Sequence, residues 1–520
     1  MAGGCGAGHV PVRRRQGCPR GVSAFGGARG GGCRGPGRYR LPHGRHRHRG
    51  QPSRYAGGRP RRLGGPGGDC PGLALCRWPQ SPRGAAGVAG RGGGGGWRGR
   101  GWPVSGAAIL TANRRFTFAA SRRLARDGWP AHRNEQVYGA GRERQWGTGE
   151  NYQAYFVFSG DVDGATGMLV NLAEVKAAIS PVVDGRYDHR FLNRDTPPFD
   201  SVPPTPENVA RQLLMEATAA CRALPPRLVA CHVAESRDTG ATAYADGRVE
   251  REFWLDFSAA RRTYSPHLSD AENREVFGVA ASPAGHGHGY RLRVVLAGEP
   301  DETTGLVAGH GVVAEALGKV HRLLDHRHLN LEVAELAGQP MTTECLARFI
   351  YRYLHRDLPV ARVRLYEMPH FFAEYDGGRF ALGLERSFSA AHRLHNPAWD
   401  EATNRRVYGK CSNANGHGHR YLVQATVAGE LDERVGIVHS LRDLDSALAE
   451  TLADWDHRHL DLEVPAFSGR PSTGENIVAL LWPGLDQRLA GKLVRLRVQE
   501  TENNRFALRR AGVEGNPCAP

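Results

Sequence analysis

The sequence lacks any run of roughly eighteen or more apolar residues, so it predicts no transmembrane helix. It also lacks the positive-then-apolar pattern of a secretory signal peptide. Its 10 cysteines form no paired framework, because five lie within the first 110 residues and the others are scattered. Such cysteine usage is typical of a reducing compartment rather than a disulfide scaffold. These absences predict a soluble cytoplasmic protein without a membrane partner.

Acidic residues are almost missing from residues 1–110, which hold 20 arginines, no lysine and one acid, Asp69. This segment carries a net charge of +19, and the total of +16 leaves −3 for the rest of the chain. It is also rich in Gly and Pro and has too little apolar surface to offset the entropy of ordering it. We expect a disordered tail, or leader sequence translated upstream of the true start. An RNA-binding arm is a third interpretation, which we rank last, so we expect no nucleic-acid partner.

The remainder of the chain repeats itself three times. The copies begin with RRFTFAASRRL (114–124), EFWLDFSAARR (252–262) and GLERSFSAAHRL (383–394). Each copy then has an Asp-His pair, at Asp188-His189, Asp325-His326 and Asp456-His457. A Thr-x-Glu motif follows, which begins at Thr205, Thr342 and Thr473. Each copy ends with a glutamate on a predicted strand, at Glu235, Glu367 and Glu500. The offset is 131 residues both from Phe257 to Phe388 and from Asp325 to Asp456. The predicted division is a leader (1–110), a degenerate first copy (111–245), a degenerate middle copy (250–378), an intact third copy (379–512) and a tail (513–520).

The third copy has the clearest periodicity. Residues 379–388, 417–427, 493–498 and 505–508 alternate like strands, and two amphipathic helices lie between the second and third of these. Ser440 is the expected cap of the first helix, and Ser472 to Glu475 reads as a capping box for the second. The predicted fold class is α+β, with ββααββ units and an antiparallel sheet. Bare sheet edges would let three such units join into a barrel-like ring.

Three histidines of the third copy have the spacing of a metal site. His417 and His419 are two residues apart on a predicted strand, so their side chains share one face. His392 ends another strand, and Cys411 lies six residues before His417. Three nitrogen ligands leave one position open, as catalytic zinc requires.

These motifs (FSAAHRL, YGKCSNANGHGHRY, Asp-His after a helix, STGEN and VQETENN) resemble the 6-pyruvoyl-tetrahydropterin synthase family. That family includes the 6-carboxytetrahydropterin synthases of queuosine and deazapurine synthesis. The resemblance implies the tunnelling fold (T-fold), in which units form trimeric barrels that commonly stack in pairs. Three tandem copies would then be a trimer ring fused into one chain, and two such rings could self-associate.

The resemblance also implies a function and roles for residues. The substrate would be 7,8-dihydroneopterin triphosphate, and the product 6-pyruvoyl- or 6-carboxy-tetrahydropterin; five residues between Cys411 and His417 favour the pyruvoyl type. Zn²⁺ would be held by His392, His417 and His419. Cys411 would be the general base and Asp456 and His457 its relay, while Glu500, Thr473 and Glu475 would bind the pterin. Glu475 has a competing interpretation as the capping-box residue.

The other copies have lost parts of this site. In the middle copy His286 and His288 persist, but Arg261 replaces the first histidine and Ala280 the cysteine. In the first copy Arg122 replaces the first histidine, and Thr148-Gly149-Glu150 replaces His-Gly-His. Because all three Asp-His pairs remain, we hypothesise that an adjacent copy donates its pair to the third-copy site. The alternative function is a catalytically inert scaffold that binds a pterin or purine.

Overall fold

The computed structural model describes residues 108–512. The expected leader lies outside these residues except for residues 108–110, which belong to the first strand, and the tail 513–520 also lies outside. No helix in the part that is described is long and apolar enough to cross a membrane.

Each copy has the predicted ββααββ order, with short elements inserted. The first copy consists of β1 (Ala108–Arg122), α1 (Ala131–Tyr138), β2 (Thr148–Ser159), α2 (Leu172–Arg186), β3 (Arg190–Phe191), α3 (Leu192–Asp195), α4 (Pro206–Ala220), β4 (Arg227–Ala234) and β5 (Thr239–Tyr244). The middle copy consists of β6 (Val249–Arg261), α5 (Asp270–Phe277), η1 (Gly278–Ala281), β7 (His286–Ala297), α6 (His310–Leu324), β8 (Arg327–His328), α7 (Leu329–Glu332), η2 (Ala334–Leu336), α8 (Thr343–Leu354), β9 (Val360–Met368) and β10 (Phe371–Tyr375).

The third copy repeats this order. It consists of β11 (Phe380–His392), α9 (Glu401–Tyr408), η3 (Gly409–Ser412), β12 (His417–Gly429), α10 (Leu441–Ala453), β13 (Arg458–His459), α11 (Leu460–Glu463), η4 (Pro465–Phe467), α12 (Gly474–Arg488), β14 (Leu493–Thr501) and β15 (Asn504–Arg510). Ser440 caps α10 as predicted, accepting a hydrogen bond from the Asp443 N–H. Between β11 and β12, where the sequence predicts neither a strand nor a helix, the chain forms α9 and η3.

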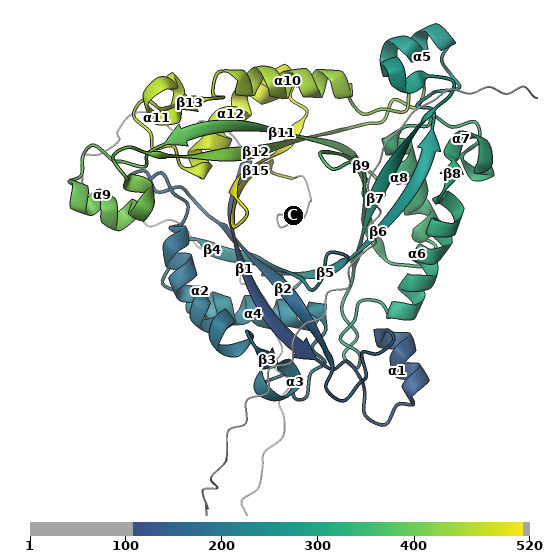
Figure 1. The fold of residues 1–520 in the computed structure, drawn as a ribbon, viewed down its shortest axis with the longest axis horizontal. Helices are drawn as coiled ribbons and strands as arrows, with labels where there is room; N and C mark the ends of the chain where they lie inside the picture. The colour runs from purple at the N-terminus through teal and green to yellow at the C-terminus, as the bar shows by residue number, and fades with distance from the viewer. Residues whose placement is uncertain (1–107, 513–520) are drawn as a thin grey trace, which may run out of the picture. The chain divides into compact units, whose positions relative to one another are not determined.

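The long strands form one closed antiparallel barrel in the described part of the chain (Figure 1). Strands β5 and β6, and β10 and β11, pair as neighbours along the sequence. The ring closes where β15 pairs with β1, placing Leu508 opposite Leu110. The chain is therefore three tandem T-fold units in a ring, and the fold class predicted from the sequence is confirmed.

The helices cover the outer face of the barrel (Figure 1). Along β12, Tyr421, Val423, Ala425 and Val427 alternate with more polar residues and are all fully buried in the core. This alternation is the two-residue period of a strand with one face against helices. The same face carries His417 and His419, so the metal histidines lie on the outer, helix-covered side.

The copies meet at three seams, each built from a helix N-terminus and a loop of the next copy. A threonine cap donates to a glycine carbonyl across each seam: Thr205 to Gly305 at 2.7 Å, Thr342 to Gly436 at 2.5 Å and Thr473 to Gly167 at 2.6 Å. The glutamate two residues later accepts from a backbone N–H across the same seam: Glu207 from Val307, Glu344 from Val438 and Glu475 from Leu169. The Thr-x-Glu motif therefore joins the copies.

The expected capping box at Ser472 to Glu475 is wrong. Thr473 is the N-cap and accepts from the Asn476 N–H, so Glu475 is the second helical residue rather than the third. From that position its carboxyl group reaches the first copy, where it accepts from the Leu169 N–H at 2.8 Å. A carboxyl group in this position cannot fold back on the cap.

The seam carboxyl groups make stability depend on pH. Burial raises the pKa of Glu344 and of Glu475 from 4.5 to about 7. Between pH 4.5 and about 7, the folded chain therefore holds the carboxyl protons of Glu344 and Glu475 more tightly than the unfolded chain does. The free energy of unfolding should therefore fall as pH rises from 4.5 to about 7, by up to about 1.4 kcal/mol per pH unit for each group.

We expect the Glu344→Gln/Glu475→Gln double variant to lose this part of the pH dependence in urea unfolding at pH 5, 6 and 7. Glutamine keeps the acceptor oxygen, so the seam hydrogen bonds can remain. The exposed Glu335→Gln variant is the control and should behave as the parent chain. An unchanged slope in the double variant would contradict the assignment.

Candidate metal and thiol site

Three histidines of the third copy converge on the outer face of the barrel. His392 ends β11 and pairs in register with His417 at the start of β12, and His419 follows on the same face. Their ligand nitrogens lie within 4.8 Å of one another, and the Nε2 atoms of His392 and His417 are 3.1 Å apart. The structure thus brings together the three residues predicted as metal ligands.

The donor set fits a divalent metal such as zinc. His392 is fully buried, and its Nδ1 lies 3.2 Å from the Ser472 carbonyl, so an Nδ1–H donating there leaves the Nε2 lone pair facing the other histidines. The buried Nδ1 of His417 has no hydrogen-bond partner in the described residues. Burial lowers the pKa of both histidines, which favours the neutral, metal-binding form.

Cys411 lies beside this cluster in η3. Its carbonyl accepts from the Leu394 N–H at 2.8 Å, which fixes the turn against the end of β11. Burial, and then the Glu500 carboxylate, raise the pKa of the thiol to about 11. A neutral thiol is a poor base, so the residues alone do not activate Cys411.

Glu500 on β14 faces the same space. Its Oε1 lies 3.9 Å from the Nε2 atoms of both His392 and His419, and its Oε2 accepts from Asn504 at 3.1 Å. The carboxylate is thus held next to the metal ligands with one oxygen turned toward them.

Thr473 and Glu475 lie in the seam between the third and first copies and are not exposed to the histidine cluster. The Thr473 hydroxyl both accepts from Asn476 and donates to Gly167, and both side chains are nearly fully buried. Around them, the first-copy segment 163–171 contacts the loop that carries Cys411, through Asn396 to the Ala165 carbonyl, Tyr408 to the Thr166 carbonyl and Asn171 to the Val407 carbonyl. The first copy therefore forms one border of the third-copy site.

The Asp-His pairs are held alike in all three copies. Each aspartate accepts from its own copy's first strand: Asp188 from Ala119, Asp325 from Ser258 and Asp456 from Ser389. The histidines have left-handed φ angles of 56°, 55° and 58°, and their side chains are 83%, 83% and 81% exposed. Neither Asp456 nor His457 makes a hydrogen bond or ion pair with Cys411 within residues 108–512.

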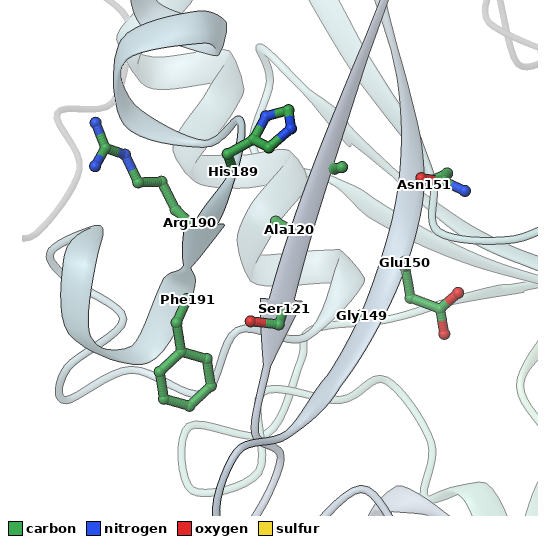
Figure 2. A pocket seen from close by; sticks show the side chains of 9 residues that line it. Ala120, Ser121, Gly149, Glu150, Asn151, His189, Arg190 and Phe191 are labelled. Carbon is green, nitrogen blue, oxygen red and sulfur yellow. The ribbon is translucent and has the colours of Figure 1, made fainter. Parts of the chain in front are cut away.

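Asp188 lies away from segment 163–171, the part of the first copy that contacts the third copy. The contact with Val407 is made by Asn171, before α2, whereas Asp188 follows the end of that 15-residue helix. The helix is roughly 22 Å long at 1.5 Å per residue. In the first copy, His189 borders a surface hollow of about 450 Å³ with Ser121 and Glu150 (Figure 2). An Asp-His pair is thus open to an approaching molecule.

An arginine occupies the first metal-ligand position in the middle copy. Arg261 pairs in register with His286, as His392 does with His417. It is almost fully buried, forms an ion pair with Glu367 and donates to the Thr343 hydroxyl at 2.9 Å. The sequence did not reveal a third donor in this copy. Glu367 lies 3.0 Å from His288 and forms a possible metal-binding group with His286 and His288.

The first copy has an arginine at the same position. Arg122 is 1% exposed, forms an ion pair with Glu235 and donates to the Pro204 carbonyl. Arg142 lies 3.4 Å from Glu235 and 3.8 Å from Glu150, the residue in the place of His419. In both degenerate copies a guanidinium group therefore supplies the positive charge beside the late glutamate. The sequence signal for this replacement was position: Arg261 and His392 are 131 residues apart, the same spacing as Phe257 and Phe388.

Replacing Arg261 should restore a metal site. Arg261→His would complete a three-histidine set with His286 and His288 and release Glu367, so bound zinc should rise by about one equivalent per chain. Equilibrium dialysis against Zn²⁺ followed by metal analysis measures this change. Arg122→His is the matched control without gain, because its neighbouring carboxylates remain paired with Arg142. Equal gains in both variants, or none with Arg261→His, would contradict the replacement.

Comparison with known proteins agrees with this arrangement. Residues 111–246, 249–378 and 381–511 each match the family described as 6-pyruvoyl tetrahydropterin synthase. The chain is similar to the human 6-pyruvoyl tetrahydrobiopterin synthase, with 42% identity over 120 residues (23% of this chain and 83% of the human protein). It is 38% identical to the Drosophila melanogaster synthase over 131 residues, 25% of this chain and 78% of that protein. The solved Caenorhabditis elegans 6-pyruvoyl tetrahydropterin synthase is 34% identical, with 25% of this chain and 95% of that chain covered and a TM-score of 0.25. Because the three matched segments span more than half of its length, the chain belongs to the 6-pyruvoyl tetrahydropterin synthase family.

Proposed function

We propose that the chain is a zinc-dependent pterin synthase, a lyase that acts on 7,8-dihydroneopterin triphosphate. Its product is 6-pyruvoyl- or 6-carboxy-tetrahydropterin, made in the cytoplasm for tetrahydropterin or queuosine and deazapurine biosynthesis. The observation that carries this proposal is the convergence of three histidines, a cysteine and a glutamate in the third copy. The names of the human and Drosophila relatives support the same class of reaction.

One active site per chain follows from the arginines. Arg122 and Arg261 occupy the space beside Glu235 and Glu367, so these carboxylates are already bound to a cation. In the third copy Glu500 has no arginine partner within residues 108–512. Its carboxylate accepts from Asn504 and can still accept hydrogen bonds from the amino group and ring N–H of a pterin. We therefore assign substrate binding to Glu500.

The reaction requires protons to move on the hydroxylated side chain of the substrate, with loss of triphosphate or of a carbon fragment. Bound by His392, His417 and His419, zinc supplies a Lewis acid for the side-chain hydroxyl groups. Cys411 takes a proton once the Asp-His pair has favoured its thiolate form, because burial and Glu500 alone keep the thiol protonated. Glu500 anchors the ring. Asp456 and His457, or an equivalent pair, exchange that proton with solvent from their exposed position. Thr473 and Glu475 hold the seam that forms the border of the site.

Removing the thiol should separate catalysis from metal binding. Cys411→Ala is expected to reduce turnover of 7,8-dihydroneopterin triphosphate by roughly 100-fold or more, the scale of a lost general base. Bound zinc should stay the same, since Cys411 is not among the three ligands. Product identified by mass and metal analysis provide the two measurements.

The matched control is Cys221→Ala, a buried cysteine at the end of α4, which should leave product formation intact. Pterin binding without any product in the unmodified protein would instead favour the inert scaffold. Loss of zinc in Cys411→Ala would contradict the ligand assignment.

The Asp-His pair that completes the site comes, we propose, from a second ring. The pairs are exposed, and Asp188 and Asp325 are bonded to their own copies rather than to the third. Self-association of two rings would bring an exposed pair of one chain against the thiol site of the other, in place of donation by an adjacent copy of the same chain.

Mixing variants tests this donation. We expect at least one of Asp188→Asn, Asp325→Asn and Asp456→Asn to lose turnover by roughly 100-fold. Mixing that variant with Cys411→Ala after dissociation should restore part of the activity, because a hybrid pairs an intact thiol with an intact Asp-His from the other ring. Sedimentation should report two chains per particle. Absence of any restoration would contradict donation between rings, and loss with Asp456→Asn alone would exclude a pair from another copy.

A further inference from the structure

The inner face of the barrel carries buried arginines that alternate with the helix-facing core residues. In the middle copy each of these arginines has its own carboxylate. Arg293 donates to Glu252 at 2.8 Å, Arg362 to Glu250 at 2.8 Å and Arg364 to Glu374 at 2.8 Å. The inner wall of the middle copy is therefore balanced in charge at these positions.

The inner wall of the third copy keeps the counterparts of Arg362 and Arg364 but none of the three carboxylates. Gln424 and Gly383 stand where the middle copy has Arg293 and Glu252. Arg495 lies opposite Thr426 as Arg362 lies opposite Val295, so the two arginines are equivalent. Ala381, opposite Ala428, stands where Glu250 lies opposite Ala297. Ala507 lies opposite Arg497, where Glu374 lies opposite Arg364.

These alanines change how the arginines are paired. Arg497 turns to Glu385 at 3.2 Å. Arg495 makes no ion pair or hydrogen bond with any residue in the range 108–512. The guanidinium of Arg505 lies 5.0 Å over the Tyr155 ring and donates from Nε to Gln499, but its buried Nη1 has no partner among the described residues. Two guanidinium groups thus lack a carboxylate.

Arg497 lies between the other two arginines, which are four residue positions apart along the paired strands, roughly 13 Å. Arg495 and Arg497 are two residues apart on one face of β14, roughly 7 Å along the strand. Arg505 lies opposite Gln499 on β15, so it is a diagonal neighbour of Arg497. Burial, and then the charge of Arg497, lower the pKa of Arg495 to about 9 and of Arg505 to about 10. Because arginine stays protonated in proteins, this marks a positive potential that the charge of Glu374 offsets only in part.

We propose that the inner wall of the third copy binds a phosphate-type oxyanion among Arg495, Arg497 and Arg505. Guanidinium groups match the oxygens of such an anion by paired N–H donors, and two unpaired positive charges match a divalent anion. The site is separate from the metal site, whose histidines lie on the opposite, helix-covered face of the sheet. It does not depend on the proposed reaction.

Titration calorimetry with inorganic phosphate, at constant ionic strength set by chloride, tests the site. The unmodified protein should bind phosphate, and Arg495→Gln and Arg505→Gln should each weaken binding roughly tenfold. Ala381→Glu restores the carboxylate of the middle copy and should abolish binding while raising the thermal midpoint. This variant keeps the proposal testable even where a glutamine variant folds poorly.

Two controls locate the anion. Arg211→Gln removes an exposed arginine of α4 and should leave phosphate binding unchanged. His417→Ala removes a metal ligand and should also retain it, which separates the wall from the metal site. No phosphate binding by the unmodified protein, or full binding by Ala381→Glu, would overturn the proposal. Loss of binding in His417→Ala would place the anion at the metal site and overturn it as well.

Discussion

The pairing of β1 with β15 holds the ring together, because it joins the two ends of the described chain. The Thr111 hydroxyl donates to the Ala507 carbonyl, 396 residues away, and the strands pair from Ala108 to Arg114. Without this pairing both strands would be bare edges. The same closure creates the third seam, where Glu475 and Thr473 meet the loop of the first copy. A copy with no metal site of its own therefore builds one border of the intact site.

A second constraint is the glutamate that follows each copy's last helix, which is buried in the first copy and largely buried in the other two. An isolated carboxylate in such a place is costly, so a cation beside it stabilises the fold. Arg122 and Arg261 provide that cation in two copies. In the third copy the equivalent residue is His392, which leaves Glu500 beside a cluster of metal-binding nitrogens. The first and middle copies thus place a cation of the polypeptide itself beside this glutamate.

Local patterns in the sequence were enough for the ββααββ units and for the shared face of His417 and His419, because these depend on periods of two and about 3.6 residues. The closed ring was expected from the bare sheet edges of each unit and from the family resemblance. Contacts between copies were out of reach. In the sequence Glu475 fits the pattern of a capping-box residue, yet its hydrogen-bond partner, the Leu169 N–H, lies 306 residues away. The sequence does not predict helix α9 because the helix has few apolar residues and buries only Asn404 and Tyr408. Only the register of the paired strands reveals that Ala381 and Glu250 are equivalent.

Fusion of three copies into one chain removes the symmetry that a trimer of identical subunits must obey. In such a trimer, every change on a strand appears three times. Two unpaired arginines in each copy would therefore give six in the barrel, and the repulsion among them would increase. Here the middle copy can keep Glu250 and Glu374 paired with its arginines while the third copy has Ala381 and Ala507. The same freedom applies on the outer face, where two copies hold arginine and one holds histidine. The tandem arrangement therefore permits one three-histidine cluster and one unbalanced inner wall to coexist in a single barrel.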